Sequence, residues 1–217
     1  RDKARTEFLE ERLNRYANAI AMNYPIRLKS GFYVVTDFTE KVLSMIDKAD
    51  LARNSIIGES KKLFAYYEDS LIEETRRREY IESQMEEALD NGEFVPYLQP
   101  KWDMRENKIA GSEALVRWIK PDGSIIYPND FIPIFEKNGF VEKLDLYMLE
   151  SVCRYIKRLL SEGKPVFPVS INQSRYLLYN KEYVHMVQDI LLKYEIPKDY
   201  IELELTETVF FLEREHM

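Results

Sequence analysis

Apolar residues recur at helical spacing in some stretches of the chain and at strand-like spacing in others, and this rhythm predicts its elements. The first part predicts a helix, a hairpin, a second helix and a strand, in that order. These elements are a helix over 4–22, a hairpin in IRLKSGFYVV with its turn at Ser30-Gly31, a helix carrying Val42, Leu43, Ile46 and Ala49, and a strand at 63–67. Together they indicate a small α+β unit.

The stretch 68–91 is different because charged residues dominate it. Ile81, Met85 and Leu89 appear only towards its end, which predicts a linker helix that is solvated first and packed in its C-terminal half. The pair Asn91-Gly92 is typical of a helix end. Two interpretations fit this helix: a plain surface helix, which we favour, and a linker that transmits a signal.

From Phe94 onward, predicted strands alternate with predicted helices. The strands are FVPYLQ, KIAGSEALVRW, VFPVSIN and YIELELTE, and the helices are NDFIPIFEKNG, DLYMLESVCRYIKRLLSEG and KEYVHMVQDILLKY. Such alternation indicates an α/β fold, with βα units around a mostly parallel sheet. In folds of this kind, reactive groups gather at the carboxyl ends of the strands.

Polar side chains stand at the ends of these predicted strands. Gln99 ends the first strand, Glu113 and Arg117 the second, Asn172 the third, and Glu204 and Glu207 the fourth. Carboxylate and amide oxygens suit a hard divalent cation such as Mg²⁺ or Mn²⁺, and a guanidinium suits a phosphate. The pattern predicts an oxygen-rich metal site near an arginine that binds phosphate.

The segment AGSEALVRW at 110–118 also has a simpler interpretation. On a helix, Glu113 and Arg117 would form a surface ion pair worth about 0.2–0.5 kcal/mol. On a strand, Glu113, Leu115 and Arg117 share one face. A glutamate at a strand end is also commonly a solvated terminus, and Trp118 is most simply a packing residue. The spacing alone leaves these interpretations open.

Composition and charge narrow the classes of function. The chain has 217 residues, a net charge of −7 and a pI of about 5.1, which argues against binding a nucleic acid polymer through its phosphates. Only two histidines are present, so a His-rich zinc site is excluded. The one cysteine, Cys153, is expected to be a buried thiol in a protein of the reducing cytoplasm. No stretch of the sequence is long and apolar enough to predict a membrane segment.

The segment SEALVRW at 112–118 resembles the signature of the EAL domain, a cyclic di-GMP phosphodiesterase domain named after the Glu-Ala-Leu found here at 113–115. YLQP resembles the opening strand of that family, and FIPIFEKNGFVEKLD resembles its segment after the signature. VSINQS resembles the strand with the metal-binding Asn, and ELELTET the Glu-x-x-Thr-Glu strand. These motifs follow the family's order from Phe94 to the end of the chain.

The resemblance implies a role for each matching residue. It implies metal ligands at Glu113, Asn172 and Glu204, and contacts to cyclic di-GMP from Gln99, Leu115 and Arg117. Glu207 is expected to anchor a neighbouring catalytic loop. The resemblance also implies two Mg²⁺ or Mn²⁺ ions, about 3.5–4 Å apart, that activate water and neutralise charge during in-line attack on phosphorus.

The resemblance further implies a (β/α)₈ TIM-barrel-like EAL domain, with about its N-terminal half in residues 92–217. The family's later acidic ligands and its Lys have no counterpart in these residues, so we expect the 217 residues alone to be inactive. The first residue is Arg rather than Met, and we expect a piece of a longer protein. Further chain, or a second copy in a homodimer, would then cover the open edge of the sheet.

VLSMIDKADLARNSIIG at 42–58 resembles the closing helix of a GGDEF domain, with the usual Ala-Lys pair altered to Asn54-Ser55. This implies that residues 1–67 are the C-terminal part of a degenerate GGDEF-like domain, joined to the EAL domain by 68–91. The expected function is hydrolysis of cyclic di-GMP to linear pGpG by the complete EAL domain, regulated by the GGDEF-like module. The alternative is an inactive EAL domain that acts as a cyclic di-GMP receptor or interaction module.

Overall fold

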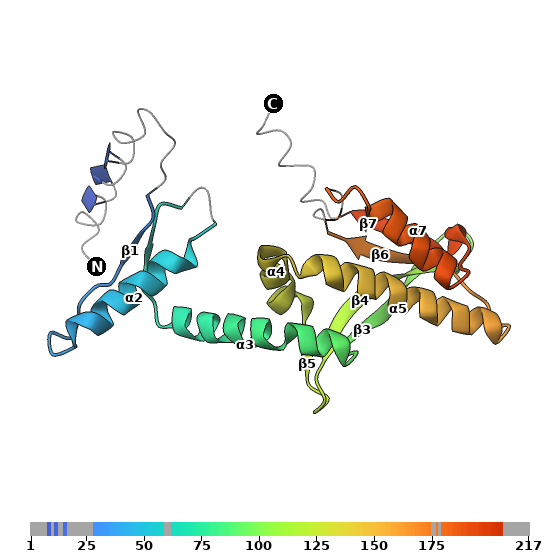
Figure 1. Cartoon of the computed structure of the whole chain (residues 1–217), viewed down its shortest axis with the longest axis horizontal. Helices are drawn as coiled ribbons and strands as arrows, with labels where there is room; N and C mark the ends of the chain where they lie inside the picture. The colour runs from blue at the N-terminus through green and yellow to red at the C-terminus, as the bar shows by residue number, and fades with distance from the viewer. Residues whose placement is uncertain are drawn as a thin grey trace. The chain divides into compact units, whose positions relative to one another are not determined.

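The structure is a computed structural model that describes residues 8–9, 11–12, 15–16, 28–58, 62–174, 177 and 179–205. The helix predicted over 4–22 lies largely outside these residues, and so does Glu207. The chain divides into two compact units, Arg1–Arg77 and Arg78–Met217. We describe each unit by itself (Figure 1).

Two short parallel strands and one helix form the described core of the first unit. Strand β1 (Ser30–Phe32) pairs with β2 (Phe64–Tyr66), and helix α2 (Val42–Ser55) connects them. The predicted hairpin is therefore wrong, because Ser30 and Gly31 lie inside a strand. The physical reason is the close approach of α2: a Cβ on Gly31 would lie 1.8 Å from the carbonyl oxygen of Ala49. Glycine is required here because it has no side chain, and not because the chain turns.

Helix α2 has the predicted position, but its buried side differs from the apolar side that the sequence suggests. Val42, Leu43 and Ile46 are exposed, whereas Ala52 is buried, as is Ile56 just after the helix. Small residues face the strands because the helix backbone lies so close to β1. The larger apolar side chains of its first two turns are consequently left on the surface.

The helix predicted over 68–91 is confirmed as α3 (Ser70–Asp90). Its first half carries an exposed ion pair between Arg76 and Glu73, and its second half buries Ile81 and Ala88. Gly92 follows the helix with a φ of +74°, a conformation that favours glycine and ends the helix. Among the helices that the structure describes, none is long and apolar enough to cross a membrane.

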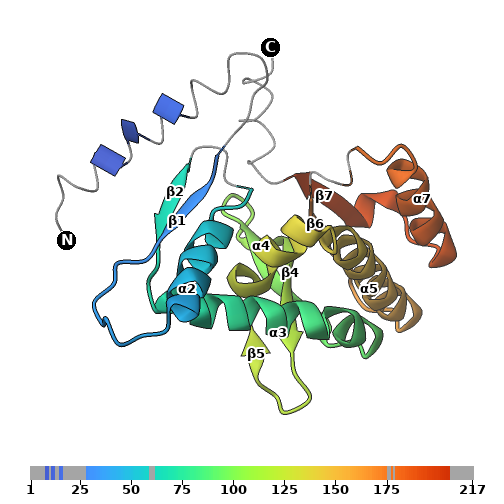
Figure 2. The same cartoon turned by 60° about the vertical axis from the view of Figure 1, so that its left-hand side comes forward.

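The second unit is built on one sheet, whose strands run in the order β3-β4-β6-β7 with β5 paired to β4. Strands β4, β5, β6 and β7 of this sheet are labelled in Figure 2. The strands are β3 (Phe94–Asp103), β4 (Lys108–Ile119), β5 (Ile125–Ile126), β6 (Val169–Gln173) and β7 (Ile201–Leu205). The helices are α4 (Pro128–Asn138), α5 (Val141–Ser161) and α7 (Tyr183–Lys193), with a short 3₁₀ turn at Lys198–Tyr200. The order of strands and helices is the predicted one, except that β5 was not expected.

The α/β class is confirmed, but the described sheet is mixed rather than mostly parallel. β4 pairs in parallel with β6, and β6 with β7, whereas β3 and β5 both run antiparallel to β4. Only residues 104–107 connect β3 to β4, with Asn107 in a left-handed conformation at a φ of 51°. So short a connection permits a hairpin and excludes the crossover that parallel strands need.

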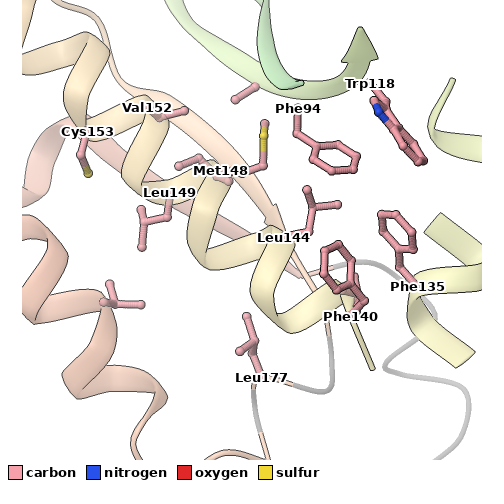
Figure 3. Close-up of a cluster of buried hydrophobic side chains, with 14 of the residues drawn as sticks. Phe94, Trp118, Phe135, Phe140, Leu144, Met148, Leu149, Val152, Cys153 and Leu177 are labelled. Atoms are coloured by element: carbon pink, nitrogen blue, oxygen red, sulfur yellow. The ribbon is translucent and has the colours of Figure 1, made fainter. Parts of the chain in front are cut away.

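Helices α4 and α5 pack on one face of this sheet and form an aromatic core with it (Figure 3). Trp118 is fully buried, with its ring centroid 4.9 Å from that of Phe94 and 5.7 Å from that of Phe131. Its indole Nε1–H donates a hydrogen bond of 2.8 Å to Glu93. Cys153 is also fully buried, and burial raises the pKa of its thiol to about 12. Both predictions, Trp118 as a packing residue and Cys153 as a buried thiol, are confirmed.

One carboxylate lies within this core. Asp145 on α5 is only 8% exposed and accepts a hydrogen bond of 2.7 Å from the backbone N–H of Ser174. Burial raises the pKa of Asp145 to about 7, the hydrogen bond from Ser174 opposes that rise, and the charges of Glu136 and Glu142 add to it. An ionised Asp145 therefore costs folding free energy at neutral pH.

We predict that Asp145→Asn stabilises the protein at pH 8 by up to a few kcal/mol and leaves it little changed near pH 4. The folded pKa of about 7 lies above the unfolded value of about 3.9. The wild type should therefore lose stability as the pH rises from about 4 to 7 and lose no more above that range. The variant lacks this titration, and its amide oxygen can still accept from Ser174. Urea unfolding across this pH range measures the difference.

The control for this prediction is Asp189→Asn, the same chemical change at an exposed carboxylate on α7. It should leave the pH dependence of unfolding as in the wild type. Equal pH profiles for wild type and Asp145→Asn would contradict the prediction.

Candidate functional site

The pairing of four strands brings the predicted polar residues onto one face of the sheet. Glu113 on β4 lies opposite Gln99 on β3 and opposite Ser170 on β6. Asn172 on β6 lies opposite Glu204 on β7. Successive side chains alternate between faces, and the neighbouring Ala114 and Ile171 are buried against the helices. The polar residues consequently project from the other face.

The prediction that these residues end their strands is only partly right. Asn172 and Glu204 are each one residue from the end of β6 and β7. Glu113 and Gln99 instead lie well inside β4 and β3, because hairpin pairing extends both strands beyond them. What the four residues share is a sheet face rather than a common edge.

Two of the three predicted metal ligands, Glu113 and Asn172, are in direct contact, and the third, Glu204, contacts a lysine instead. The amide Nδ2 of Asn172 donates a hydrogen bond of 2.8 Å to Glu113 Oε1. Glu204 accepts a hydrogen bond of 2.5 Å from the ammonium of Lys101, which also lies 3.7 Å from Glu202. The structure therefore brings together Glu113 with Asn172, and Glu204 with a lysine that the sequence analysis did not single out.

Lys101 places a positive charge among these carboxylates. Glu204 raises the pKa of Lys101, with smaller contributions from Glu202 and Glu113. Lys101 in turn holds the pKa of Glu204 below its ordinary value. The sequence did contain a signal, because Lys101 follows Gln99 by two residues and must share its strand face. The register with Glu204 was not readable from the sequence.

Ser170 has a buried hydroxyl on the same face. Its Oγ makes no hydrogen bond of normal geometry within the described residues, although it lies near enough to Glu204 to help lower the pKa of that carboxyl. A buried hydroxyl without a partner is uncommon in folded proteins. The described residues hold no cluster of three or more His, Cys, Asp or Glu side chains. The donor set is therefore two carboxylates, one amide and one hydroxyl, all hard oxygen donors, which fits a magnesium-like cation.

Arg117 lies on the same strand face as Glu113, four residues further along β4. Its Nη1 donates 2.8 Å to the Val116 carbonyl, and its guanidinium lies 5.9 Å from the ring centroids of both Tyr97 and Tyr127. Both tyrosines are about half exposed, at 46% and 57%. These two rings, which were not predicted from the sequence, place flat apolar surfaces beside a cation suited to phosphate.

Comparison with known proteins identifies the family. The family model of the EAL domain matches residues 82–217, which is more than half of the chain. The chain therefore belongs to the EAL domain family. The matched region contains every strand of the second unit.

Two curated relatives and one solved structure illustrate the similarity. The signaling protein YkoW of Bacillus subtilis is 28% identical over 167 residues, covering 77% of this chain and 21% of YkoW. The probable cyclic di-GMP phosphodiesterase PdeB of Escherichia coli is 31% identical over 135 residues, covering 62% of this chain and 26% of PdeB. A structure entitled PaMucR phosphodiesterase, c-di-GMP complex, is 26% identical with a TM-score of 0.57, covering 63% of this chain and 56% of the other. This chain thus spans about a quarter or less of these two curated relatives.

We predict that Lys101→Met raises the pKa of Glu204 towards its ordinary value, because the hydrogen bond and charge that lower it are removed. Titration of the glutamate side-chain carboxyl signals by ¹³C NMR measures this pKa. Lys108→Met is the control, since that exposed lysine pairs with Glu106 instead. An unchanged Glu204 pKa in Lys101→Met would refute the ion pair.

Proposed function

We propose that this chain supplies part of an EAL domain that binds cyclic di-GMP and, when complete, hydrolyses it to linear pGpG. The observation that carries the proposal is the shared sheet face of Glu113, Asn172 and Glu204, with Arg117 further along β4. Family membership supports it, and so do the names of PdeB and of the MucR complex.

Glu113, Asn172 and Glu204 would hold Mg²⁺ or Mn²⁺ in this proposal, with Ser170 close by. Such an ion, or a pair of ions in the complete domain, supplies a Lewis acid and lowers the pKa of a bound water. The chain's own residues define where the cation lies: the two carboxylates provide charge, and the Asn172 amide fixes the Glu113 carboxylate by hydrogen bonding. Glu207, outside the described residues, would anchor a neighbouring catalytic loop.

Arg117, Gln99 and Leu115 would contact the cyclic dinucleotide. A guanidinium matches a phosphodiester, which carries charge and two free oxygens. Tyr97 and Tyr127 beside Arg117 offer exposed ring faces on which a guanine base could stack, a contact worth about 1–3 kcal/mol per base. Gln99, exposed and opposite Glu113, is available for a neutral hydrogen bond.

Lys101 favours a second candidate function, a receptor that binds cyclic di-GMP without cleaving it. Its ammonium already neutralises part of the charge of Glu204 and so competes with a metal ion for that carboxylate. The pair is about 40% exposed on each side, so the competition is weak in water and screened by salt. We rank hydrolysis first because the partly exposed Lys101 ammonium, with half the charge of a divalent cation, would be the weaker partner for Glu204.

The first unit, with the linker helix, is proposed to regulate the EAL domain. We assign 1–67 to a degenerate GGDEF-like domain, 68–91 to the linker helix and 92–217 to the EAL domain. The sequence resemblance of 42–58 supports this assignment. The division of the chain into two compact units falls within the proposed linker helix, between Arg77 and Arg78. The packing of Ile81 and Ala88 supports a linker whose second half belongs structurally to the EAL domain.

We predict that Glu113→Gln, in the natural full-length protein that contains this chain, lowers cyclic di-GMP turnover by at least about 100-fold. The amide keeps the shape of the side chain and removes the charge that holds the cation. Release of pGpG is measured at several Mn²⁺ concentrations, together with the melting temperature. The fold should survive, because this face of the sheet contributes little to the apolar core.

Glu202→Gln is the matched control, because Glu202 shares the face but is not a proposed ligand. It should retain turnover close to that of the wild type. Near wild-type turnover in Glu113→Gln would remove the metal assignment. Cyclic di-GMP binding without pGpG release by the wild type would establish the receptor instead.

We predict that Arg117→Ala weakens cyclic di-GMP binding about tenfold or more and leaves Mn²⁺ affinity nearly unchanged, because it removes a charge-assisted contact to phosphate. Calorimetric titration with nucleotide and with Mn²⁺ separates the two effects. Arg105→Ala, an exposed arginine in the turn between β3 and β4, is the control. Equal nucleotide affinity in Arg117→Ala and wild type would rule out the phosphate contact.

A further inference from the structure

A chain of hydrogen bonds runs from helix α7 to the candidate metal ligands. The Tyr183 hydroxyl, at the start of α7, donates 2.8 Å to Oε1 of Gln173. The Nε2 of Gln173 donates 2.9 Å to the backbone carbonyl of Asn172. The Asn172 amide then donates 2.8 Å to Glu113. The last two hydrogen bonds are joined through Asn172, and the series ends at the Glu113 carboxylate, which is proposed to bind the cation.

Gln173 is the unusual member of this chain because it points into the core. It is 1% exposed, and Tyr183 is 7% exposed. Burying an amide is unfavourable unless its polar atoms are satisfied, and an apolar side chain would fill the same space without that cost. Gln173 is satisfied at its oxygen by Tyr183 and at its nitrogen by Asn172. Its amide therefore ties the backbone of the metal-ligand strand to a neighbouring helix.

A second buried contact secures the residue that follows. Asp145 on α5 accepts 2.7 Å from the backbone N–H of Ser174, immediately after β6. Two helices consequently hold two successive residues beyond Asn172, each through a buried polar side chain. The end of β6 is fixed from the helix side as well as by its strand pairing.

Packing around the end of β6 is incomplete. A cavity of about 170 Å³ borders Asn172, Gln173 and Ser174, between the sheet and helices α4 and α5. Space beside a strand end allows it to shift unless directed contacts hold it. The hydrogen bonds of Gln173 and Asp145 supply these contacts.

We propose that Gln173, held by Tyr183, is a positioning residue that sets the orientation of Asn172 and thereby the affinity of the site for its divalent cation. The proposal rests on the proposed metal-binding function. It extends that function to α7, whose first residue becomes part of the support of the site. Residues that orient ligands in this way typically change metal affinity about 10- to 100-fold when altered.

Tyr183→Phe in the natural full-length protein tests the proposal, because it removes one hydroxyl and keeps the ring. Mn²⁺ affinity, measured by calorimetry or by the electron paramagnetic resonance of free Mn²⁺, should weaken about 10-fold. Gln173→Met keeps the size of the side chain and removes both hydrogen bonds, and it should weaken Mn²⁺ binding at least as much. Combining the two changes should add little to Gln173→Met, since both act through one contact.

Val187→Ala is the matched control, because Val187 is a buried apolar residue on the same helix and lies outside the hydrogen-bond chain. It should lower the melting temperature without changing Mn²⁺ affinity. Equal Mn²⁺ affinity in Tyr183→Phe and wild type would overturn the proposal, and so would equal weakening in Tyr183→Phe and Val187→Ala.

Glu204→Gln distinguishes this failure from failure of the proposed function. If Glu204→Gln loses Mn²⁺ binding while Tyr183→Phe binds as the wild type does, the positioning role is wrong and the metal site stands. If Glu204→Gln binds Mn²⁺ as tightly as the wild type, the metal site itself is wrong. A wild type that binds no Mn²⁺ overturns both.

Discussion

The register between β4, β6 and β7 is the constraint on which the candidate site depends. Ala114 and Ile171 must face the helices, because these residues complete the apolar core. With those two residues buried, Glu113, Asn172 and Glu204 are forced to the opposite face. A slip of one residue in β4 or β6 would exchange the faces of that strand, burying its polar side chains and exposing Ala114 or Ile171. The packing of the apolar core on one face thus determines which polar side chains lie on the other face of the sheet.

Carboxylates that lie close together on one sheet face repel each other, and neighbouring groups must offset this repulsion. Lys101 does this for Glu204, and the Asn172 amide does it for Glu113 by donating a hydrogen bond. Both arrangements are compatible with a divalent cation, since a cation satisfies the same carboxylates more strongly. The competition between Lys101 and a metal ion for the Glu204 carboxylate bears on whether the domain is a phosphodiesterase or a receptor.

Buried polar groups connect this face to the helices behind it. Asp145 and Gln173 lie where apolar residues would be less costly, and both bond to the backbone at the end of β6. Such groups make the strand end sensitive to the positions of α5 and α7. In the role proposed for Gln173, a movement of α7 would reach Asn172 through the hydrogen bonds of Tyr183 and Gln173.

Local patterns in the sequence predicted every strand and α-helix of the second unit except β5, its α/β class, and the burial of Trp118 and Cys153. They also predicted that the polar residues come together, but at a common edge rather than on a common face. Apolar periodicity and strand alternation are local properties, so they can be read without a fold. The prediction of a turn at Ser30-Gly31 was wrong. Glycine is needed at position 31 because the backbone of helix α2 passes too close for a side chain. Lys101, Tyr97 and Tyr127 were also not predicted from the sequence. Their contacts became visible only in the folded structure, because strand register and helix packing bring together residues that are far apart in the sequence. No local sequence pattern indicates which of these residues will be in contact.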